Sequence, residues 1–207
     1  MSRYTGPKCR KCRQIGSKLF LKGERCAKKC PLDHNKPYPP GQHGKSSLGK
    51  KSEFAKQKRE KQKTRYMFGM NEKQFHLIFE KAEKKTGITG DNLLQLLERR
   101  LDNVVYRAGF ATSRDQARQF INHGLFQVNG KKVNTPSFIV KSLDKFELST
   151  SGKKTKVFEN IKNLKLRPPR WMKIDVNKAL GEIIDLPKNE DLEKSINSQT
   201  IIEFYSK

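Results

Sequence analysis

Apolar side chains recur every three to four residues along two stretches in the middle of the chain, and this periodicity predicts amphipathic helices. The first helix is expected over residues 74–85. The second begins at Asp91, whose side chain can cap it, and carries a leucine-rich stripe that continues to Val105. Gly109 is a suitable stop for this second helix, because glycine readily adopts the left-handed conformation that ends helices.

The pattern then changes from helical to strand-like. Ser113 and Gln116 have the spacing of a capping box, which predicts the start of a third helix. Apolar residues on either side of Asn129-Gly130 predict a hairpin with a type I′ turn. Further strands are expected over 138–140 and 146–148. Two helices followed by a small sheet, all edged with cations, are typical of a compact nucleic-acid-binding module.

One more helix is predicted over residues 54–66, where the pattern is basic rather than apolar. Ser52 is a suitable N-cap for it, with Glu53 in the first turn. Its cations surround the helix on nearly all sides, so we expect contact with phosphates rather than a merely solvated helix. Nearer the C-terminus, Trp171 is interpreted as a core residue, and the stretch 201–205 as a final strand or a segment docked beside the first helices.

Charge points to the class of partner. The 207 residues carry a net charge of +24, and residues 1–65 alone hold 20 Lys and Arg against four Asp and Glu. A polyanion is the expected partner, with nucleic acid favoured over an anionic membrane surface. The apolar runs are too short to cross a bilayer and no secretory signal is visible, so a cytoplasmic protein is expected.

All four cysteines fall in the N-terminal arm, at Cys9, Cys12, Cys26 and Cys30. Two close pairs joined by a short insert are typical of a tetrahedral metal site, with zinc expected and an iron–sulfur cluster as the alternative. Without a metal, the four cysteines would be free thiols or would form two disulfides. Four protein ligands leave no open position, so catalysis at such a metal is not expected. Residues 18–21, between the pairs, are expected to form a short strand.

The run SRDQARQFINHGLFQVNGKKVNTPSF resembles the small RNA-binding domain shared by ribosomal protein S4, several pseudouridine synthases and some tRNA synthetases. The rest of the chain resembles the bacterial type of ribosomal protein S4, in its cysteine-bearing form. The resemblance is carried, in order, by the cysteine segment, KPYPPGQHG, TRYMFGMNEKQF, LERRLDNVVYRAGFATSR and IIEFYSK. It covers nearly the whole length of the chain.

This resemblance implies an α+β fold. A helical, discontinuous domain would contain an inserted small α/β RNA-binding module, made of two helices and a small antiparallel sheet, and would follow an N-terminal metal-binding arm. The expected boundaries are 1–45 for the arm, 46–90 for the helical domain, completed by 182–207, and 91–181 for the RNA-binding module.

The resemblance also implies a function. The protein would be a ribosome-bound structural constituent of the small subunit, not an enzyme, that binds 16S rRNA, nucleates assembly of the subunit body and contributes to translational accuracy. Its implied partners are small-subunit rRNA, ribosomal protein S5 and other small-subunit proteins, and mRNA near its entry path. No membrane or small-molecule substrate is implied.

Basic side chains are the candidate RNA contacts. Arg114 and Arg118, at i and i+4 of the third helix, are expected to share one exposed face. The cations beside the cysteines, including Arg25, Lys28 and Lys29, are expected to be held against rRNA by the metal site. The full candidate set is Arg3, Arg10, Lys11, Arg13, Lys45, Lys50, Lys51, Lys56, Arg59, Lys61, Lys63, Arg65, Arg114, Arg118, His123, Lys131 and Lys132.

Two alternative functions remain. The first is an RNA-modifying enzyme of the pseudouridine synthase type, because Arg100-Leu101-Asp102 resembles the sequence around the catalytic aspartate of that class. Asp102 falls inside a predicted helix, however, and is better explained as a helix or ion-pair residue. The second alternative is a metal-stabilised regulator that binds its own mRNA.

Overall fold

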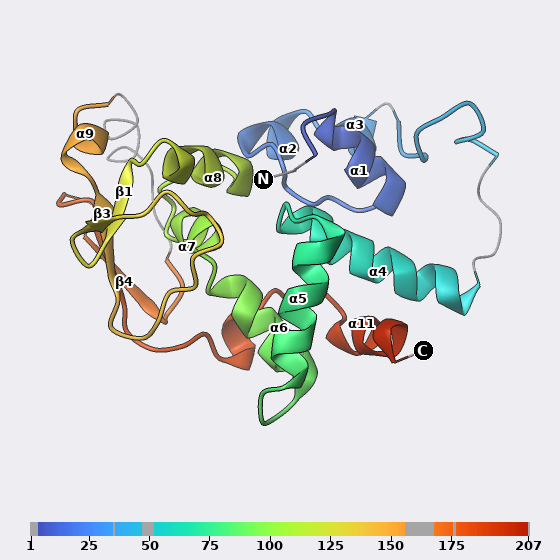
Figure 1. The fold of residues 1–207 in the computed structure, drawn as a ribbon. Helices are drawn as coiled ribbons and strands as arrows, with labels where there is room; N and C mark the ends of the chain where they lie inside the picture. The colour runs from blue at the N-terminus through green and yellow to red at the C-terminus, as the bar shows by residue number, and fades with distance from the viewer. Residues whose placement is uncertain (1–3, 35, 47–51, 156–167, 176, 207) are drawn as a thin grey trace. The chain divides into compact units, whose positions relative to one another are not determined.

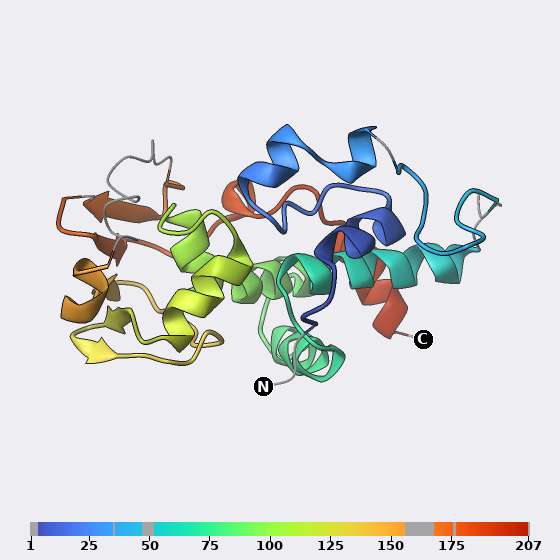
Figure 2. The ribbon, with the colours of Figure 1, turned by 90° about the horizontal axis from the view of Figure 1, so that it is seen from above.

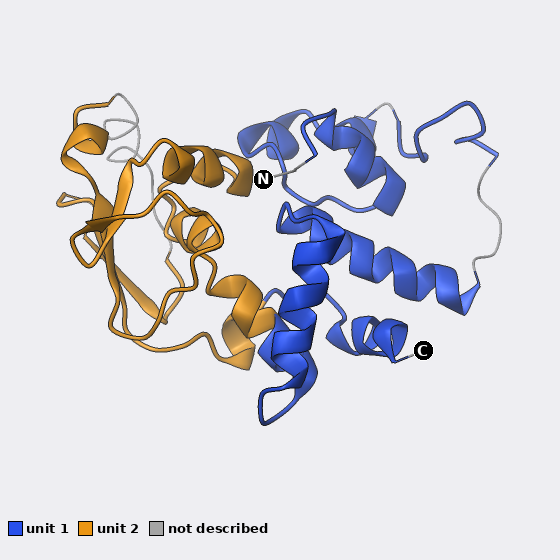
Figure 3. Cartoon of the chain, viewed as in Figure 1, with its two compact units in different colours: residues 1–93, 193–207 blue, residues 94–192 orange. Residues whose placement is uncertain are grey.

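The computed structural model describes residues 4–34, 36–46, 52–155, 168–175 and 177–206 (Figure 1). It is a mixed α and β structure, mostly helical, with a small antiparallel sheet, and this confirms the predicted α+β class. The chain divides into two compact units (Figure 3). One unit, here the arm unit, combines residues 1–93 with 193–207, and the other, here the sheet unit, contains residues 94–192.

The arm unit is helical within its described residues. Its buried apolar side chains include Phe75, Phe79 and Ile201. Both α1 and α11 pack against α4, and Figure 1 shows them on opposite sides of it, while Figure 2 shows α1 against α4 from above. The helices are α1 (Lys8–Ile15), α2 (Glu24–Lys28), α3 (Pro31–His34), α4 (Glu53–Met67), α5 (Glu72–Glu83), the first part of α6 (Thr89–Glu98) and α11 (Ser198–Tyr205).

Three sequence expectations in this unit have definite outcomes. The Ser52 hydroxyl accepts a hydrogen bond from the Ala55 amide at 3.3 Å, which confirms it as the N-cap of α4. Residues 201–205 form the helix α11 rather than a strand, and they dock on α4. The strand expected over 18–21 is wrong, since Phe20 has a positive φ of 50° and turns the chain.

The long leucine-rich helix is broken in two, which corrects the prediction of one continuous helix from Asp91 to its stop at Gly109. α6 ends at Glu98 and α7 begins at Leu101, with Arg100 in an extended conformation (ψ 136°) between them. A backbone amide at the break is satisfied by another segment of the chain: the Leu101 amide donates to the Phe138 carbonyl at 2.8 Å. Residues 138–140, expected as a strand, therefore contribute an isolated bridge between Arg100 and Ile139.

Within its described residues, the sheet unit has five antiparallel strands in the order β2-β1-β3-β5-β4. Asn129 and Gly130 have φ values of 49° and 76°, both positive as a type I′ turn requires, so the predicted hairpin is confirmed. The expected strand at 146–148 is also confirmed. The strands are β1 (Phe126–Val128), β2 (Lys131–Lys132), β3 (Lys145–Leu148), β4 (Met172–Asp175) and β5 (Leu180–Ile183).

Two helices share a hydrophobic core with this sheet. They are α7 (Leu101–Arg107) and α8 (Arg114–Asn122). The described part of the unit also contains two short elements, α9 (Thr150–Lys153) and the 3₁₀ helix η1 (Asn189–Asp191). The Ser113 hydroxyl accepts from the Gln116 amide at 3.3 Å, as the capping box predicts. Trp171 is buried in this core, in agreement with its interpretation as a core residue.

Candidate nucleic-acid interface and cysteine cluster

Predicted RNA contacts anchor the arm to α4. The Arg59 Nε donates to the carbonyl of Ile15, the last residue of α1, at 2.8 Å. Lys11, on α1, places its Nζ 4.3 Å from the centre of the Tyr66 ring, a cation–π distance. Both cations are half-buried. Lys11 and Arg59 therefore have structural partners within the protein.

The proline-rich loop is held in a similar way. Arg13 Nε donates to the Tyr38 carbonyl at 3.0 Å, and its guanidinium also donates to the Pro39 carbonyl. Lys45 is exposed and lies 5.7 Å from the centre of the Tyr38 ring. Arg10 is exposed on α1. Of these candidate contacts, Arg10 and Lys45 are the ones that solvent reaches most fully.

The four cysteines line one small cavity, of about 10 Å³. All four are free thiols, and Cys12, Cys26 and Cys30 are buried. Burial, and then the nearby thiols, raise the pKa of Cys12, although its hydrogen bond with the Leu19 backbone opposes this. The Lys22 amide lies 3.3 Å from the Cys26 sulfur, within donating distance. The two cysteine pairs thus converge, as the sequence spacing predicts.

Convergence is not the same as a ligand geometry. Within the described ranges, no group of three or more His, Cys, Asp or Glu side chains is arranged to hold a metal ion. The donor chemistry of four thiols suits zinc. The structure itself shows a cluster of four free thiols around one cavity.

The cations of α4 divide between solvent and interior, although all were expected to face phosphates. Lys56 is exposed. Lys61 is 6% exposed and donates to the Glu72 carboxylate at 2.5 Å. Lys63 is paired with a neighbouring carboxylate on α4 at 3.1 Å, and Arg65 lies 3.7 Å from Glu72. Much of the positive charge of this helix is thus neutralised inside the arm unit.

The pKa shifts around Lys61 reflect this pairing. Burial alone raises the pKa of Glu72, but the Lys61 hydrogen bond and the charges of Lys61 and Arg65 outweigh it, so the pKa lies below its ordinary value of 4.5. The Tyr205 hydroxyl donates to Glu72 at 3.2 Å. Burial and the Glu72 carboxylate raise the pKa of Tyr205 well above its ordinary value of 10.0. Lys61 also lies 4.4 Å from the centre of the Phe204 ring.

Arg114 and Arg118 do not share an exposed face, which corrects the sequence prediction. Arg118 is 4% exposed and lies 3.7 Å from the Asp102 carboxylate. Arg114 is half-buried, donates to the Asn103 side chain at 2.7 Å and covers the Tyr106 ring at 4.6 Å. The amphipathic period of α8 placed both on its polar side, but α7 supplies polar partners there.

Asp102 belongs to this interior network. It accepts two hydrogen bonds from Arg100, at 3.1 and 2.7 Å, and also lies 3.7 Å from Arg118. Asn103 and Arg107 bind the buried Glu98 carboxylate at 2.6 and 2.8 Å. These contacts confirm the interpretation of Asp102 as an ion-pair residue.

The remaining candidates lie at the surface or outside the described residues. His123 ends α8, and Lys131 and Lys132 form β2 beyond the hairpin turn; all three are exposed. Arg3, Lys50 and Lys51 fall outside the described ranges. Sequence reasoning missed two basic residues, His34 and Lys36, which join the arm's cations around a cavity. Their position directly after the second cysteine pair was the available signal.

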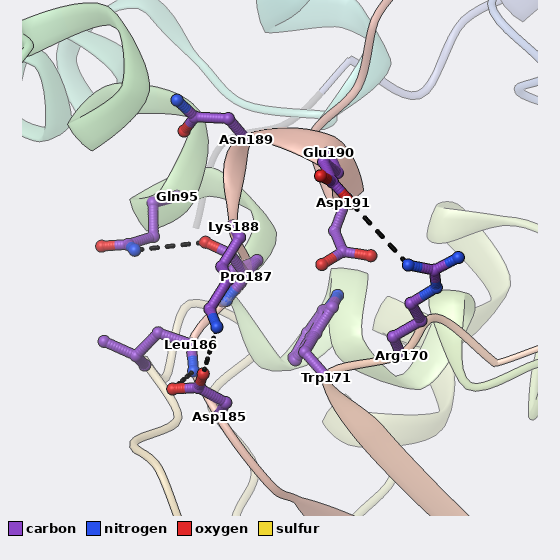
Figure 4. Close-up of a pocket in the computed structure, with 10 residues that line it drawn as sticks. All are labelled: Gln95, Arg170, Trp171, Asp185, Leu186, Pro187, Lys188, Asn189, Glu190 and Asp191. Atoms are coloured by element: carbon purple, nitrogen blue, oxygen red, sulfur yellow. Dashed lines mark hydrogen bonds and ion pairs between the residues drawn. The ribbon is translucent and has the colours of Figure 1, made fainter.

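A larger cavity, of about 840 Å³, lies in the sheet unit beside residues 185–191 (Figure 4). Its charges oppose one another. Arg170 lies 3.7 Å from Glu190, and Lys188 lies 3.3 Å from Asp185. With Asp191, the described lining carries three carboxylates against two cations, so the cavity has no preference for a polyanion. Across the described part of the chain, no helix is long and apolar enough to cross a membrane.

Comparison with known proteins agrees with the motifs. Residues 3–98 match the ribosomal protein S4/S9 N-terminal domain, and residues 99–145 match the S4 domain. The chain is 49% identical to small ribosomal subunit protein uS4 of Syntrophomonas wolfei over 210 residues. It is 48% identical to the uS4 proteins of Halothermothrix orenii and Thermodesulfovibrio yellowstonii. In all three cases 100% of both chains is covered.

Proposed function

The chain belongs to the family of small ribosomal subunit protein uS4, and from this membership we propose that it binds small-subunit rRNA as a structural component of the ribosome. It is a ribosomal protein and not an enzyme. The observation that carries the proposal is the S4 domain match over residues 99–145 in a chain of net charge +24. Phosphate contacts by Lys and Arg supply most of the affinity of such proteins for RNA.

The exposed cations are the proposed contacts. They lie on the arm, at the start of α4, at the end of α8 and on the β1–β2 hairpin, and shape recognition of folded RNA suits cations distributed in this way. Lys61 and Arg118 are not proposed, because burial and ion pairing commit their charges to the interior. The proposed set is Arg10, Lys45, Lys56, His123, Lys131 and Lys132.

Salt dependence tests this function. Binding of the purified protein to a small-subunit rRNA transcript should weaken steeply between about 50 and 200 mM salt, because each neutralised phosphate releases counterions. Filter binding across that range gives the slope. A nearly flat slope, or equal affinity for an unrelated RNA of the same length, contradicts the proposal.

Family membership supports finer roles. As part of the proposal, early binding would nucleate assembly of the subunit body, and contacts with ribosomal protein S5 and with mRNA near its entry path would influence translational accuracy. The protein would be cytoplasmic and bound to ribosomes. Co-sedimentation with small subunits after a high-salt wash tests the core role, and recovery of the protein in the free pool argues against it.

Zinc binding by Cys9, Cys12, Cys26 and Cys30 is a further part of the proposal. The convergence of the four thiols on one cavity supports it, because four cysteine sulfurs are a common ligand set for a structural zinc ion. Zinc would supply cohesion to an arm with few apolar side chains. Metal analysis of the purified protein should give about one zinc per chain. Iron and acid-labile sulfide would indicate a cluster instead, and absence of both metals overturns this part.

A further inference from the structure

The cavity of Figure 4, here the acidic cavity, has an excess of negative charge in a strongly basic chain. Its described lining holds three carboxylates and two cations, whereas the chain as a whole carries a net charge of +24. Its volume of about 840 Å³ is within the range of ligand-binding sites. A concave surface with an excess of one sign attracts the opposite charge. The charged lining residues are Asp185, Glu190, Asp191, Arg170 and Lys188.

The walls of the acidic cavity come from three segments of the sheet unit. Gln95, on α6, donates from its Nε2 to the Pro187 carbonyl at 3.2 Å. The Ile184 amide donates to the Trp171 carbonyl at 2.9 Å. These hydrogen bonds connect the segment after β5 to α6 and to the residue before β4. The walls are therefore held in place by contacts within the unit.

Trp171 supplies this cavity with a hydrogen-bond donor that has no acceptor. Its side chain is 3% exposed and lines the cavity. Figure 4 shows the nitrogen end of its indole on the side of Asp191 and Arg170. No described residue accepts a hydrogen bond from the indole N–H. Because a buried tryptophan usually finds a partner for this group, the N–H is left for an acceptor that a ligand brings.

The carboxylates of the acidic cavity are also available. Asp191 is half-buried, and within the described residues its carboxylate has no ion pair. Glu190 lies 3.7 Å from Arg170, and Asp185 lies 3.3 Å from Lys188. All four of these side chains are more than half exposed, so both pairs are weak. A ligand's cations can therefore replace Arg170 and Lys188, which can turn to solvent.

We propose that the acidic cavity binds an extended, lysine- or arginine-rich peptide segment of another protein. A peptide brings both of the groups that the site lacks. One of its backbone carbonyls accepts from the Trp171 indole, and its cationic side chains pair with Asp191 and the neighbouring carboxylates. This inference goes beyond the proposed rRNA binding, because it assigns a surface to a protein partner.

Other classes of ligand match the site less well. The excess of carboxylates repels the phosphates of RNA. A polyamine brings cations, but its protonated amines offer no acceptor to the indole N–H. An apolar peptide leaves the carboxylates without partners. Within the described ranges, no three His, Cys, Asp or Glu side chains are arranged to hold a metal ion.

The first test uses the fact that Trp171 is the single tryptophan of the chain, so its fluorescence reports directly on the cavity. A blocked peptide of alternating lysine and glycine, titrated into the full-length protein, should change the Trp171 emission saturably. A matched peptide of glutamate and glycine should not. Unchanged emission, together with no binding of the labelled lysine peptide by anisotropy, overturns the proposal.

The second test changes the charge of the cavity. In E190Q/D191N, affinity for the lysine peptide should fall about tenfold, since hydrogen bonds to charged groups are stronger than those between neutral groups. The matched control is E147Q/E182Q, which removes two carboxylates from β3 and β5 that do not line this cavity. The control should remain within about twofold of wild type. An equal loss in the control means that only net charge matters, and overturns the proposal.

The third test concerns the indole N–H. W171F keeps an aromatic ring and removes this donor, so the labelled peptide should bind about fivefold more weakly by anisotropy. Unchanged affinity of W171F overturns the assignment to a peptide, as does spermidine that competes as strongly as the lysine peptide. Circular dichroism checks the fold of each variant, and D185N repeats the charge test if E190Q/D191N unfolds.

Binding of a small-subunit rRNA transcript, measured in parallel, separates this proposal from the proposed function. E190Q/D191N should keep its rRNA affinity, because carboxylates do not contact phosphates. A loss of rRNA affinity in this variant assigns the cavity to RNA and overturns the proposal. A flat salt slope in wild type refutes the proposed function and leaves the peptide tests in force.

Discussion

At the scale of single residues, the Asp102 carboxylate forms ion pairs with two buried arginines of the sheet unit. Arg100 and Arg118 are both buried and both have this carboxylate as a neighbouring anion. Removing one partner of a buried ion pair leaves an uncompensated charge, which typically costs about 3–5 kcal/mol. Asp102→Ala should therefore lower the free energy of unfolding by about that amount, measured by urea denaturation.

The matched control is Asp185→Ala, which removes an aspartate whose ion pair with Lys188 is exposed. Solvent screens such pairs, so the urea midpoint of Asp185→Ala should stay close to that of the wild-type protein. Equal midpoints for the two variants would show that the Asp102 network contributes no more than a surface pair.

The burial of Arg114 and Arg118 could not be predicted from the sequence. The spacing of Arg114 and Arg118 correctly placed them on one side of α8, but the pattern cannot tell a solvated side from one that meets buried acceptors on another helix. Asp102 and Asn103 provide those acceptors through tertiary packing. Charged residues in such a network look like surface residues in the sequence.

At the scale of elements, the contact of α4, α5 and α11 depends on the charge of Glu72. Its lowered pKa means that the carboxylate is stabilised by folding: the contribution is present above the ordinary value of 4.5 and is lost as pH falls through the lower folded pKa. Acid should therefore loosen α11 from α4. We expect Glu72→Gln to be less stable near pH 7 and to lose less stability than wild type below pH 4.5, measured by thermal melts.

A parallel loss of stability in wild type and Glu72→Gln across the acid range would contradict this prediction. Glu53→Gln is a suitable control, since Glu53 lies on the same helix as Lys61 but pairs with the exposed Lys56. Its acid profile should follow that of wild type.

Elements whose ends are set by neighbouring residues could be predicted from the sequence. Elements whose ends are set by contacts with distant residues could not. The Ser52 cap and the Asn129-Gly130 turn are set by adjacent residues. The break between α6 and α7 arises because Arg100 pairs with residues near Ile139, although the leucine pattern continues through it. Strands β4 and β5 were missed because four-residue strands without a strong alternation give little signal.

At the scale of the whole molecule, the arm unit is assembled from both ends of the chain. A protein ending at residue 192 lacks α11, and with it Ile201, Phe204 and Tyr205, which contribute to the packing around α4 and α5. We expect this truncation to lose amide-exchange protection in α4 and α5 while β1 and β3 keep theirs. Hydrogen-exchange mass spectrometry distinguishes the two regions.

The control for this truncation removes only residues 206–207, which follow α11. This shorter truncation should leave the amide-exchange protection of both units unchanged. Loss of protection in β1 and β3 after truncation at 192 would show that the sheet unit does not fold independently of the arm unit.

This arrangement of units imposes an order in time on a chain that is made from its N-terminus. The sheet unit is contiguous, so a nascent polypeptide contains all of it before the codons for α11 are translated. The arm unit lacks α11 until the codons for residues 198–205 have been translated. The proposed contacts of the S4 domain can thus form first, whereas the arm unit reaches its full packing only after α11 has been made.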